Sequence, residues 1–376
     1  METFQIPATL GLYFHVPFCA SKCKYCDFYS FAGPEAQMDA YVDAMCRAIA
    51  AWGMRCQGAK VDTVYFGGGT PSLLGAVRLG RILTAARAGF ALQDDAEITV
   101  ECNPDSMTGG LLDALHAMGV NRLSVGVQSA SDCELRMLGR RHTFAQAQRA
   151  VERAHASGFA NLSLDLMYAL PGQDAGQALA SLQALLALGP VHLSCYALKI
   201  ESGTPLAREN VTQPDEDIQA DMYLALCDAL RQAGFEHYEI SNWAKPGFRA
   251  RHNARYWDLS DYLGIGPSAH SLLGGKRFAY ADDLDAFLAA KPPIPEEEVE
   301  GFTPALEYLM LALRTADGVQ PAAFAARFGQ PFAPFAARLE RFRAPGLAAY
   351  SAGRWRLTEQ GFLLSNPILA DVLSAQ

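Results

Sequence analysis

The sequence predicts an α/β fold in which a parallel sheet, closed or partly closed into a (β/α)6 barrel, precedes a small helical or winged-helix-like domain. Short runs rich in Val, Ile, Leu and aromatic residues recur through the first two hundred residues, each followed by a helical pattern. Polar or glycine-rich residues follow nearly every run. A proline-rich acidic stretch then precedes the last ~75 residues, which a separate small domain would occupy.

The six predicted strands follow one another along the chain and begin at Gly11, Val61, Ala96, Asn121, Asn161 and Val191. A predicted helix before the last strand carries a leucine stripe from Leu179 to Leu186, and another helix follows Pro214. Strand–helix alternation of this length favours a parallel barrel. A doubly wound open sheet is the alternative, because periodicity alone does not distinguish the two.

The ends of the predicted strands carry the residues with chemical potential. In a barrel these ends converge on one face, where binding and catalysis take place. A cysteine loop follows the first strand, GGGTPS the second, and Glu101-Cys102-Asn103-Pro104 the third. Gln128 follows the fourth strand and Asp165 lies within the fifth. We therefore expect these side chains to meet around one site.

The stretch AKPPIPEEEVE, from Ala290 to Glu300, indicates a linker or domain boundary. The predicted division is a core barrel over residues 1–240, a barrel extension over 241–290 and a small domain over 291–376. In the last part PALEYLMLALR predicts a helix and WRLTEQG a strand and turn. Winged helices often bind DNA, but the formal net charge of -9 does not support nucleic-acid binding.

Composition is that of an ordinary globular protein, with 50% apolar and 19% charged residues. The N-terminal METFQIPATL lacks the basic and apolar parts of a secretory signal, and no uncharged apolar run reaches the roughly 18 residues of a membrane span. We expect a cytoplasmic protein, whose nine cysteines are thiols or metal ligands rather than disulfides. Outside the cysteine loop, they are expected to be small core residues.

Cys19, Cys23 and Cys26 form a C-x3-C-x2-C loop with no fourth cysteine nearby. A structural zinc site would need a distant fourth ligand. A cubane iron–sulfur cluster fits better, because each iron already carries three sulfides and takes one outer thiolate. Three cysteines would leave one iron open, and a chelating substrate can bind at such a vacant position.

This loop is the signature of the radical S-adenosylmethionine (SAM) superfamily, whose fold is a partial (β/α)6 barrel. YFHVPFCASKCKYCDF, GGGTPSLL, ECNPDS, RLSVGVQS, LGRRH, LDLMYALPGQ and HNARYW together resemble the oxygen-independent coproporphyrinogen III oxidase-like family, and within it the haem-chaperone branch. The resemblance covers nearly the whole chain, including the C-terminal domain. It implies that Cys19, Cys23 and Cys26 ligate a [4Fe-4S] cluster whose open iron chelates SAM.

The resemblance further implies SAM contacts at the matching positions Tyr13, Gly68, Gly69, Thr70, Glu101, Gln128, Arg140 and Asp165. The residue types agree, because glycines allow close backbone approach and an arginine can fork onto a carboxylate. Taken alone, Arg140 would be a surface charge. Asp165 lies in an apolar strand, where a carboxylate needs a partner.

Two features distinguish the branches of this family. Its oxidases carry a further cysteine where Phe28 stands here and a longer segment before the first strand, whereas about a dozen residues precede Tyr13. In the haem-chaperone branch the HNxxYW motif, here His252 to Trp257, is linked to haem binding, with the imidazole as an axial ligand and the aromatic rings stacking on the macrocycle. Taken alone, the motif would be a capped turn with a surface histidine, and His270 is a second candidate ligand.

We therefore predict a haem chaperone of radical-SAM fold that binds haem, a [4Fe-4S] cluster and SAM. Its partners would be haem-acceptor proteins, among them membrane respiratory enzymes, with any membrane contact peripheral. The alternatives are oxygen-independent oxidation of coproporphyrinogen III and another radical SAM reaction on a tetrapyrrole. The sequence leaves open whether SAM is cleaved productively and what the oligomeric state is.

Overall fold

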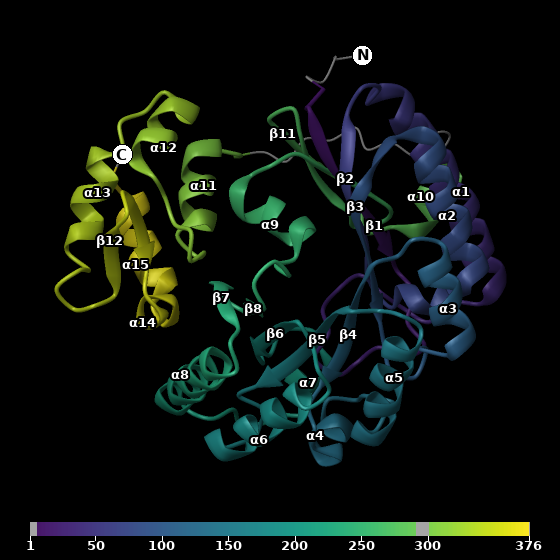
Figure 1. The fold of residues 1–376 in the computed structure, drawn as a ribbon, viewed down its shortest axis with the longest axis horizontal. Coiled ribbons are helices and arrows are strands. Elements are labelled where there is room, and N and C mark those ends of the chain that lie inside the picture. Colours follow the sequence, from purple (N-terminus) through teal and green to yellow (C-terminus); the bar gives the residue numbers. More distant parts are fainter. Residues whose placement is uncertain (1–5, 291–300, 376) are drawn as a thin grey trace.

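The computed structural model describes residues 6–290 and 301–375, and a curved sheet runs through its centre (Figure 1). Six parallel strands lie side by side in chain order: β1 (Thr9–Val16), β2 (Lys60–Gly68), β3 (Ala91–Cys102), β4 (Arg122–Gln128), β5 (Asn161–Tyr168) and β6 (His192–Ala197). All six predicted strands are confirmed. The doubly wound alternative is wrong, because such a sheet reverses its strand order and this one does not.

The barrel is partial, because β1 and β6 each pair with an added strand instead of with one another. On the β1 side the sheet continues through β9 (Tyr262–Ile265), which is parallel to β1, and then through the antiparallel strands β10 (His270–Leu273) and β11 (Lys276–Ala279). On the β6 side it continues through β8 (Asn242–Ala244) and β7 (Glu236–Glu239), both antiparallel to their neighbours.

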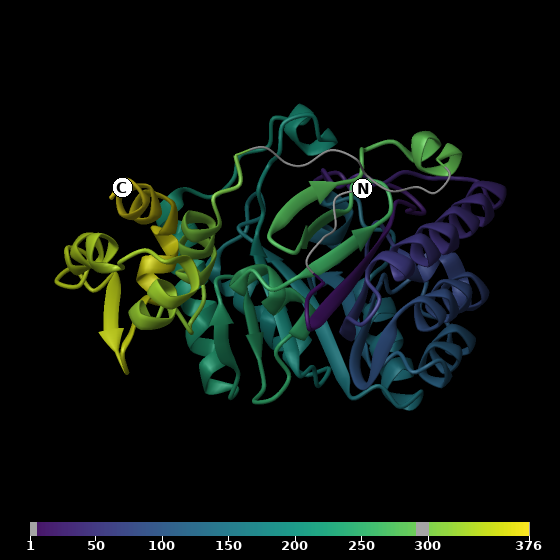
Figure 2. The same ribbon diagram turned by 90° about the horizontal axis from the view of Figure 1, so that it is seen from above.

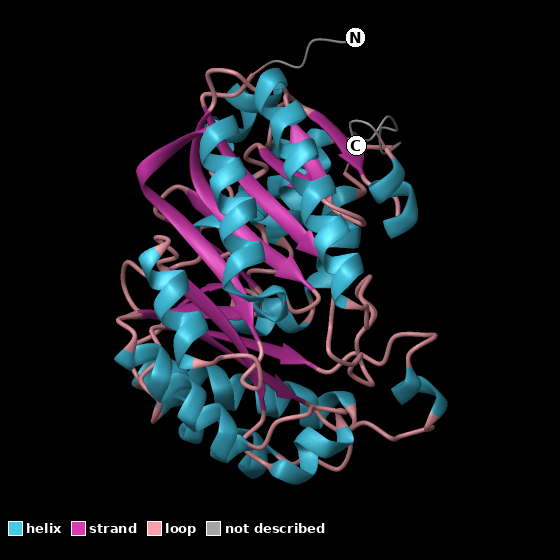
Figure 3. Cartoon of the chain, turned by 90° about the vertical axis from the view of Figure 1, so that its right-hand side faces the viewer, coloured by secondary structure: helices cyan, strands magenta, loops and turns pink. Residues whose placement is uncertain are grey.

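Helices cover the outer face of the parallel strands (Figure 3). The longer ones are α1 (Glu35–Arg55), α2 (Gly75–Gly89), α3 (Gly109–Ala117), α5 (Phe144–Ala156), α6 (Ala175–Leu186) and α8 (Glu216–Gln232). The chain also forms shorter helices, η1 (Pro71–Leu74), α4 (Asp132–Met137), α7 (Pro205–Arg208), α9 (Arg251–Asp258) and α10 (Leu284–Ala289). Of these, α9 lies on the opposite face of the sheet from α1 and α2 (Figure 1). The predicted leucine stripe of α6 places Leu182 and Leu185 in the core. Helix α5 begins with a capping box between Thr143 and Gln146, which satisfies two backbone N–H groups.

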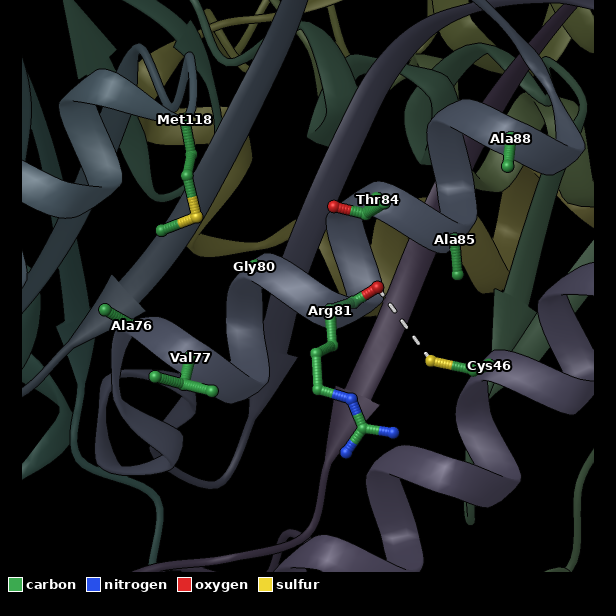
Figure 4. Close-up of a pocket in the computed structure, with 9 residues that line it drawn as sticks. All are labelled: Cys46, Ala76, Val77, Gly80, Arg81, Thr84, Ala85, Ala88 and Met118. Atoms are coloured by element: carbon green, nitrogen blue, oxygen red, sulfur yellow. Dashed lines mark hydrogen bonds between the residues drawn. The ribbon is translucent and has the colours of Figure 1, made fainter.

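A surface hollow of about 610 Å³ lies in this helical layer, away from the strand ends (Figure 4). It is lined mainly by small side chains: Cys46, Ala76, Val77, Gly80, Arg81, Thr84, Ala85, Ala88 and Met118. The Cys46 thiol donates a weak hydrogen bond to the Arg81 carbonyl, 3.9 Å away. Its lining offers one thiol and one guanidinium, which is not the donor set of a metal or cofactor site.

The C-terminal residues form a separate lobe beside β7, the edge strand on the β6 side of the sheet (Figure 2). It contains α11 (Pro304–Ala312), α12 (Pro321–Phe328), α13 (Ala333–Glu340), the hairpin of β12 (Ala348–Ser351) and β13 (Arg354–Leu357), α14 (Glu359–Leu363) and α15 (Ser365–Leu373). The predicted helix in PALEYLMLALR and the strand in WRLTEQG are confirmed. The lobe joins the sheet edge through backbone hydrogen bonds from Ala316 N–H to the Tyr238 carbonyl and from Ile240 N–H to the Arg314 carbonyl, both 3.0 Å.

The predicted linker lies almost wholly outside the described residues, which stop at Ala290 and resume at Gly301. The predicted boundary at residue 240 falls in the turn between β7 and β8, and the division into three parts stays a prediction. None of the helices in the described ranges is long and apolar enough to cross a membrane.

Candidate functional site

The strand ends converge on a cavity of about 420 Å³ at the mouth of the partial barrel. Ten of the residues predicted to bind the cluster and SAM line it: Cys19, Cys23, Cys26, Gly68, Gly69, Thr70, Glu101, Gln128, Arg140 and Asp165. They come from five strand ends and the loops behind them, far apart in the sequence. We call this space the cysteine cavity. Tyr13 and His252, which were also predicted to bind cofactors, do not line it.

The three loop cysteines are partly exposed towards the cysteine cavity. The Thr70 hydroxyl donates to the Cys19 sulfur at 3.5 Å, and the Arg140 guanidinium donates to the Cys23 sulfur at 3.4 Å. Within the described ranges, these sulfurs belong to no group of three ligand atoms that all lie within 4.8 Å of one another. The three sulfurs are therefore not gathered around one point as ligands of a single zinc ion would be, whereas a cubane cluster takes one thiolate at each of several separate corners.

The glycines of GGGTPS hold the cysteine loop in place. Gly69 N–H donates to the Val16 carbonyl and Thr70 N–H to the Phe18 carbonyl, both at 2.7 Å. A Cβ on Gly69 would lie 2.6 Å from that Phe18 oxygen, so only glycine allows the approach. Gly68 has φ +107°, and a Cβ there would lie 2.6 Å from the His15 ring. These two positions therefore fix the turn after β2 against the loop that carries the cysteines.

Arg140 is half-buried with its guanidinium among protein partners, and the expectation from the residue taken alone, a surface charge, is wrong. It donates to the Asn103 side-chain oxygen at 2.7 Å and to the Gly126 carbonyl at 2.6 Å, while its Nε has no protein partner in the described structure. Asn103 in turn donates to the Thr70 hydroxyl at 3.0 Å. One chain of hydrogen bonds thus connects Cys23 to Cys19 through these three side chains.

Asn103 was expected at the converging strand ends but was not among the residues predicted to contact SAM. Tyr25, Ser124 and Met167 also line the cysteine cavity; they lie within the quoted motifs, but no role was assigned to them. Tyr196, at the end of the sixth strand, lines it as well and lies outside those motifs. Cys102 lines it too, but burial raises the pKa of its thiol to about 12, so it stays protonated in the absence of a metal.

Two half-buried carboxylates give the cysteine cavity its electrostatic character. Glu101 accepts hydrogen bonds from the Tyr65 hydroxyl at 2.8 Å and from Gly68 N–H at 3.2 Å, yet burial raises its pKa to about 7. Asp165 accepts from the Ser124 hydroxyl at 3.4 Å, and burial raises its pKa to about 6. The partner that a carboxylate in an apolar strand requires is thus a serine hydroxyl. A positively charged ligand in the cavity would favour the ionised form of both acids.

Gln128 ends β4 with φ 72°, a conformation that side-chain-bearing residues rarely adopt. The residue is buried and lies on the wall of the cysteine cavity. Backbone strain of this kind concentrates at binding and catalytic sites, where the surrounding fold enforces it.

A second cavity, of about 500 Å³, adjoins the first and shares Glu101 and Tyr196 with it. Aromatic side chains dominate its wall, and we call it the aromatic cavity: Tyr13, Tyr65, Tyr196, Tyr256 and Trp257. Leu311 of α11 contributes to the same wall, so the C-terminal lobe closes one side. Tyr13, predicted to contact SAM, faces this cavity and lies with its hydroxyl 3.1 Å from His15 Nδ1.

His252 is fully buried on α9, and the alternative of a surface histidine is wrong. Its Nδ1 lies 2.9 Å from the Thr63 hydroxyl and its Nε2 lies 2.9 Å from the Tyr256 hydroxyl. Burial, together with nearby arginines, lowers its pKa to about 3, so the ring is neutral. Both ring nitrogens are engaged, and coordination of haem iron by His252 would require at least one of these contacts to break. That role stays a prediction.

The remaining cysteines differ in their surroundings. The expected core position is confirmed for Cys56, Cys102, Cys195 and Cys227. It is wrong for Cys133, which is exposed at the start of α4, because the apolar face of that short helix is carried by Leu135 instead.

Comparison with known proteins agrees with this geometry. The model of the radical SAM superfamily matches residues 13–185, and that of the HemN C-terminal domain matches residues 303–364. The haem chaperone HemW of Lactococcus lactis is 34% identical over 96% of both chains, and the haem chaperone HemW of Escherichia coli is 35% identical over 96% of this chain and 97% of its own.

A mitochondrial protein of Bos taurus, named radical S-adenosyl methionine domain-containing protein 1, is 39% identical over 69% of this chain and 60% of its own. Among solved structures, the coproporphyrinogen III oxidase HemN of Escherichia coli superposes with a TM-score of 0.85 over 98% of this chain and 91% of its own. At 22% identity this similarity shows a shared fold.

Proposed function

The chain belongs to the HemW family of radical SAM proteins, and from that premise we propose that it is a haem chaperone. It binds haem, a [4Fe-4S] cluster and SAM, and it delivers the haem to acceptor haem proteins. The observation that carries this proposal is the pair of adjoining cavities, one built around thiols and one around aromatic rings, which share Glu101 and Tyr196.

The cysteine cavity is suited to the cluster and to SAM. Cys19, Cys23 and Cys26 would hold the cluster, which supplies an open iron position for chelation and an electron for SAM cleavage when it is reduced. Arg140 offers a half-buried cation on the cavity wall for a carboxylate ligand. Glu101 and Asp165 offer negative charge for the amino group or sulfonium of SAM, or hydrogen-bond acceptors for its ribose.

The aromatic cavity is suited to a flat macrocycle. Tyrosine and tryptophan faces bury large apolar area and stack against planar rings. Tyr256 and Trp257 of the HNxxYW motif both line this cavity, whereas His252 lies behind Tyr256. A bound haem would therefore meet Tyr256 and Trp257 before His252, which is the hydrogen-bond partner of the Tyr256 hydroxyl.

The acceptors in this proposal are haem proteins that include membrane respiratory enzymes, which the chain meets from the cytoplasm through peripheral contact. The support is the resemblance to the haem-chaperone branch. A transfer assay tests this part: haem-loaded protein is mixed with an apo respiratory haem protein in membrane vesicles, and the acceptor's absorbance spectrum should appear while the donor's Soret band declines.

One experiment tests the function itself. The reconstituted protein is incubated anaerobically with coproporphyrinogen III, SAM and a reductant, and separately with haem. We expect no protoporphyrinogen and a shifted Soret band on haem addition. Phe28, which is 64% exposed on the cavity wall, occupies the position where the related oxidases carry a further cysteine. Vinyl product at enzymatic turnover would show that the protein is an oxidase and would overturn the proposal.

A further inference from the structure

Three side chains with metal-ligand chemistry meet where the C-terminal lobe joins the barrel. Cys227 comes from α8, His237 from β7 and Glu359 from the first position of α14. One ligand atom from each lies within 4.8 Å of the other two, and within residues 6–290 and 301–375 this is the only such group of three. The chain thus brings a thiol and an imidazole that are close in sequence together with a carboxylate that lies 122 residues after the imidazole.

The imidazole of His237 is held rigidly. Its ring stacks on Trp243 with centroids 4.2 Å apart and an interplanar angle of 11°, and the Phe362 ring packs edge-on at 5.4 Å. One ring nitrogen, Nδ1, lies 3.4 Å from Glu359 Oε1, while Nε2 lies 3.5 Å from the Tyr223 hydroxyl. A metal-binding histidine usually has such a partner on its second nitrogen, which orients the ring and sets its tautomer.

The carboxylate of Glu359 is also oriented by a neighbouring side chain. Its Oε2 accepts a hydrogen bond from Arg231 at 2.5 Å, which leaves Oε1 directed towards His237. The Glu359 side chain is 30% exposed and Cys227 is buried, so an ion could enter from the solvent side and meet the thiol last.

We propose that Cys227, His237 and Glu359 bind a divalent ion of the zinc class, which fastens the C-terminal lobe to the barrel. One sulfur, one nitrogen and one oxygen donor form a borderline set that zinc prefers, and water completes the tetrahedron. Ligand atoms on one zinc ion lie roughly 3 to 4 Å apart, so the three side chains need only small movements to close on it. The Cys227 thiol loses its proton to solvent as the metal–sulfur bond forms.

This site is separate from the cysteine cavity, and its test does not depend on the proposed function. The test uses the full chain without the competing thiols of the cysteine loop, which are removed by the substitutions Cys19→Ser, Cys23→Ser and Cys26→Ser. Cobalt(II) is titrated into this protein without haem or SAM. We expect one equivalent to bind with a thiolate-to-cobalt absorption band in the near ultraviolet, and zinc to bleach that band.

Adding Cys227→Ser should remove the band and weaken binding at least ~10-fold, since loss of one ligand leaves two. Cys56→Ser is the matched control, because Cys56 is also buried but lies at the end of α1. Glu359→Gln keeps the shape of the side chain and should weaken binding while leaving the circular dichroism spectrum unchanged. If the band is absent, or equally strong in the Cys227→Ser protein, the proposal is overturned.

Discussion

The cysteine cavity and helix α9 carry the two sets of residues predicted to bind cofactors, and the fold treats them in opposite ways. Around the cavity, thiols, carboxylates and a guanidinium line a space of about 420 Å³ in which a ligand can reach them, although several also have hydrogen-bond partners. On α9, His252 is fully buried and both of its ring nitrogens have partners. The difference shows that residue type specifies what a group can do, whereas packing decides whether it is free to do it.

The physical cause lies in where each set sits. Strands end at the mouth of the barrel, where no further layer covers the side chains. Helix α9 instead packs against β2, and its first turn is capped from the sheet, because the Glu97 carboxylate accepts from Arg251 N–H and His252 N–H at 3.1 Å each. A carboxylate at a helix N-terminus satisfies free N–H groups and suits the helix dipole.

The largest expected effect is at the cysteine cavity, whose groups are accessible to a ligand. Cys23→Ala should abolish the [4Fe-4S] cluster. One corner of the cubane has no thiolate to begin with, and the two thiolates that remain after the substitution do not hold the cluster. Iron content and the broad absorption near 400 nm after anaerobic reconstitution measure it. Cys133→Ala, at an exposed thiol outside the cavity, should keep both. Full iron content in the Cys23→Ala protein would mean that the cluster is held elsewhere.

Arg140→Gln should weaken SAM binding roughly 10- to 100-fold, because it removes a charge on the cavity wall that also positions Cys23 and Asn103. Equilibrium dialysis of SAM against the cluster-loaded protein measures the change. The neighbouring Arg141 is a matched control, since it is mostly exposed and forms only a 3.7 Å ion pair with Asp105. An Arg141→Gln protein as weak as Arg140→Gln would contradict the role given to the Arg140 guanidinium.

His252→Ala tests the other half of the comparison, the packed residues of α9. It should lower the free energy of unfolding by about 2 to 3 kcal/mol, because the Thr63 and Tyr256 hydroxyls lose a buried partner and a cavity forms. Tyr256→Phe removes a single hydrogen bond and should cost about 1 kcal/mol. Chemical denaturation of the haem-free proteins measures both. If His252→Ala left stability unchanged but removed haem binding, the motif would be an accessible ligand site and the comparison would fail.

The smallest expected effect is the change of SAM affinity and of stability with pH. Burial raises the folded pKa of Asp165 to about 6 and that of Glu101 to about 7, so both acids ionise as the pH rises through this window. Ionised acids attract cationic SAM, and its dissociation constant should fall several-fold between pH 5 and pH 8. The stability of the ligand-free protein should decline over the window between the unfolded values near 4 and these folded values, because the folded state binds more protons there.

Glu101→Gln separates the contribution of Glu101 to the pH dependence of SAM affinity from that of Asp165. The amide does not ionise, so the pH dependence of SAM affinity should flatten in its upper part, and isothermal titration calorimetry at several pH values measures it. An unchanged slope in this protein would assign the effect to a group other than Glu101.

The six strands, the loop cysteines and the convergence of strand ends were predictable because periodicity and motif spacing are local properties of the chain. Taken alone, Arg140 would have been a surface charge, and only the family resemblance assigned it to the site, because its position depends on Cys23 after β1, Asn103 after β3 and Gly126 in β4. Asn103 was expected at the converging strand ends, but its hydrogen-bonding role was not predicted. Its role as a bridge between Arg140 and Thr70 exists only once the ends of β2 and β3 are adjacent.

The sequence by itself determined the alternation of strands and helices, the three thiols and the family to which the chain belongs. The tertiary structure decided which groups are accessible and how they titrate. His252 is closed off by Thr63, which lies 189 residues away, and His237 meets Glu359 across 122 residues. Contacts over such separations depend on how whole elements pack, and no local pattern encodes them.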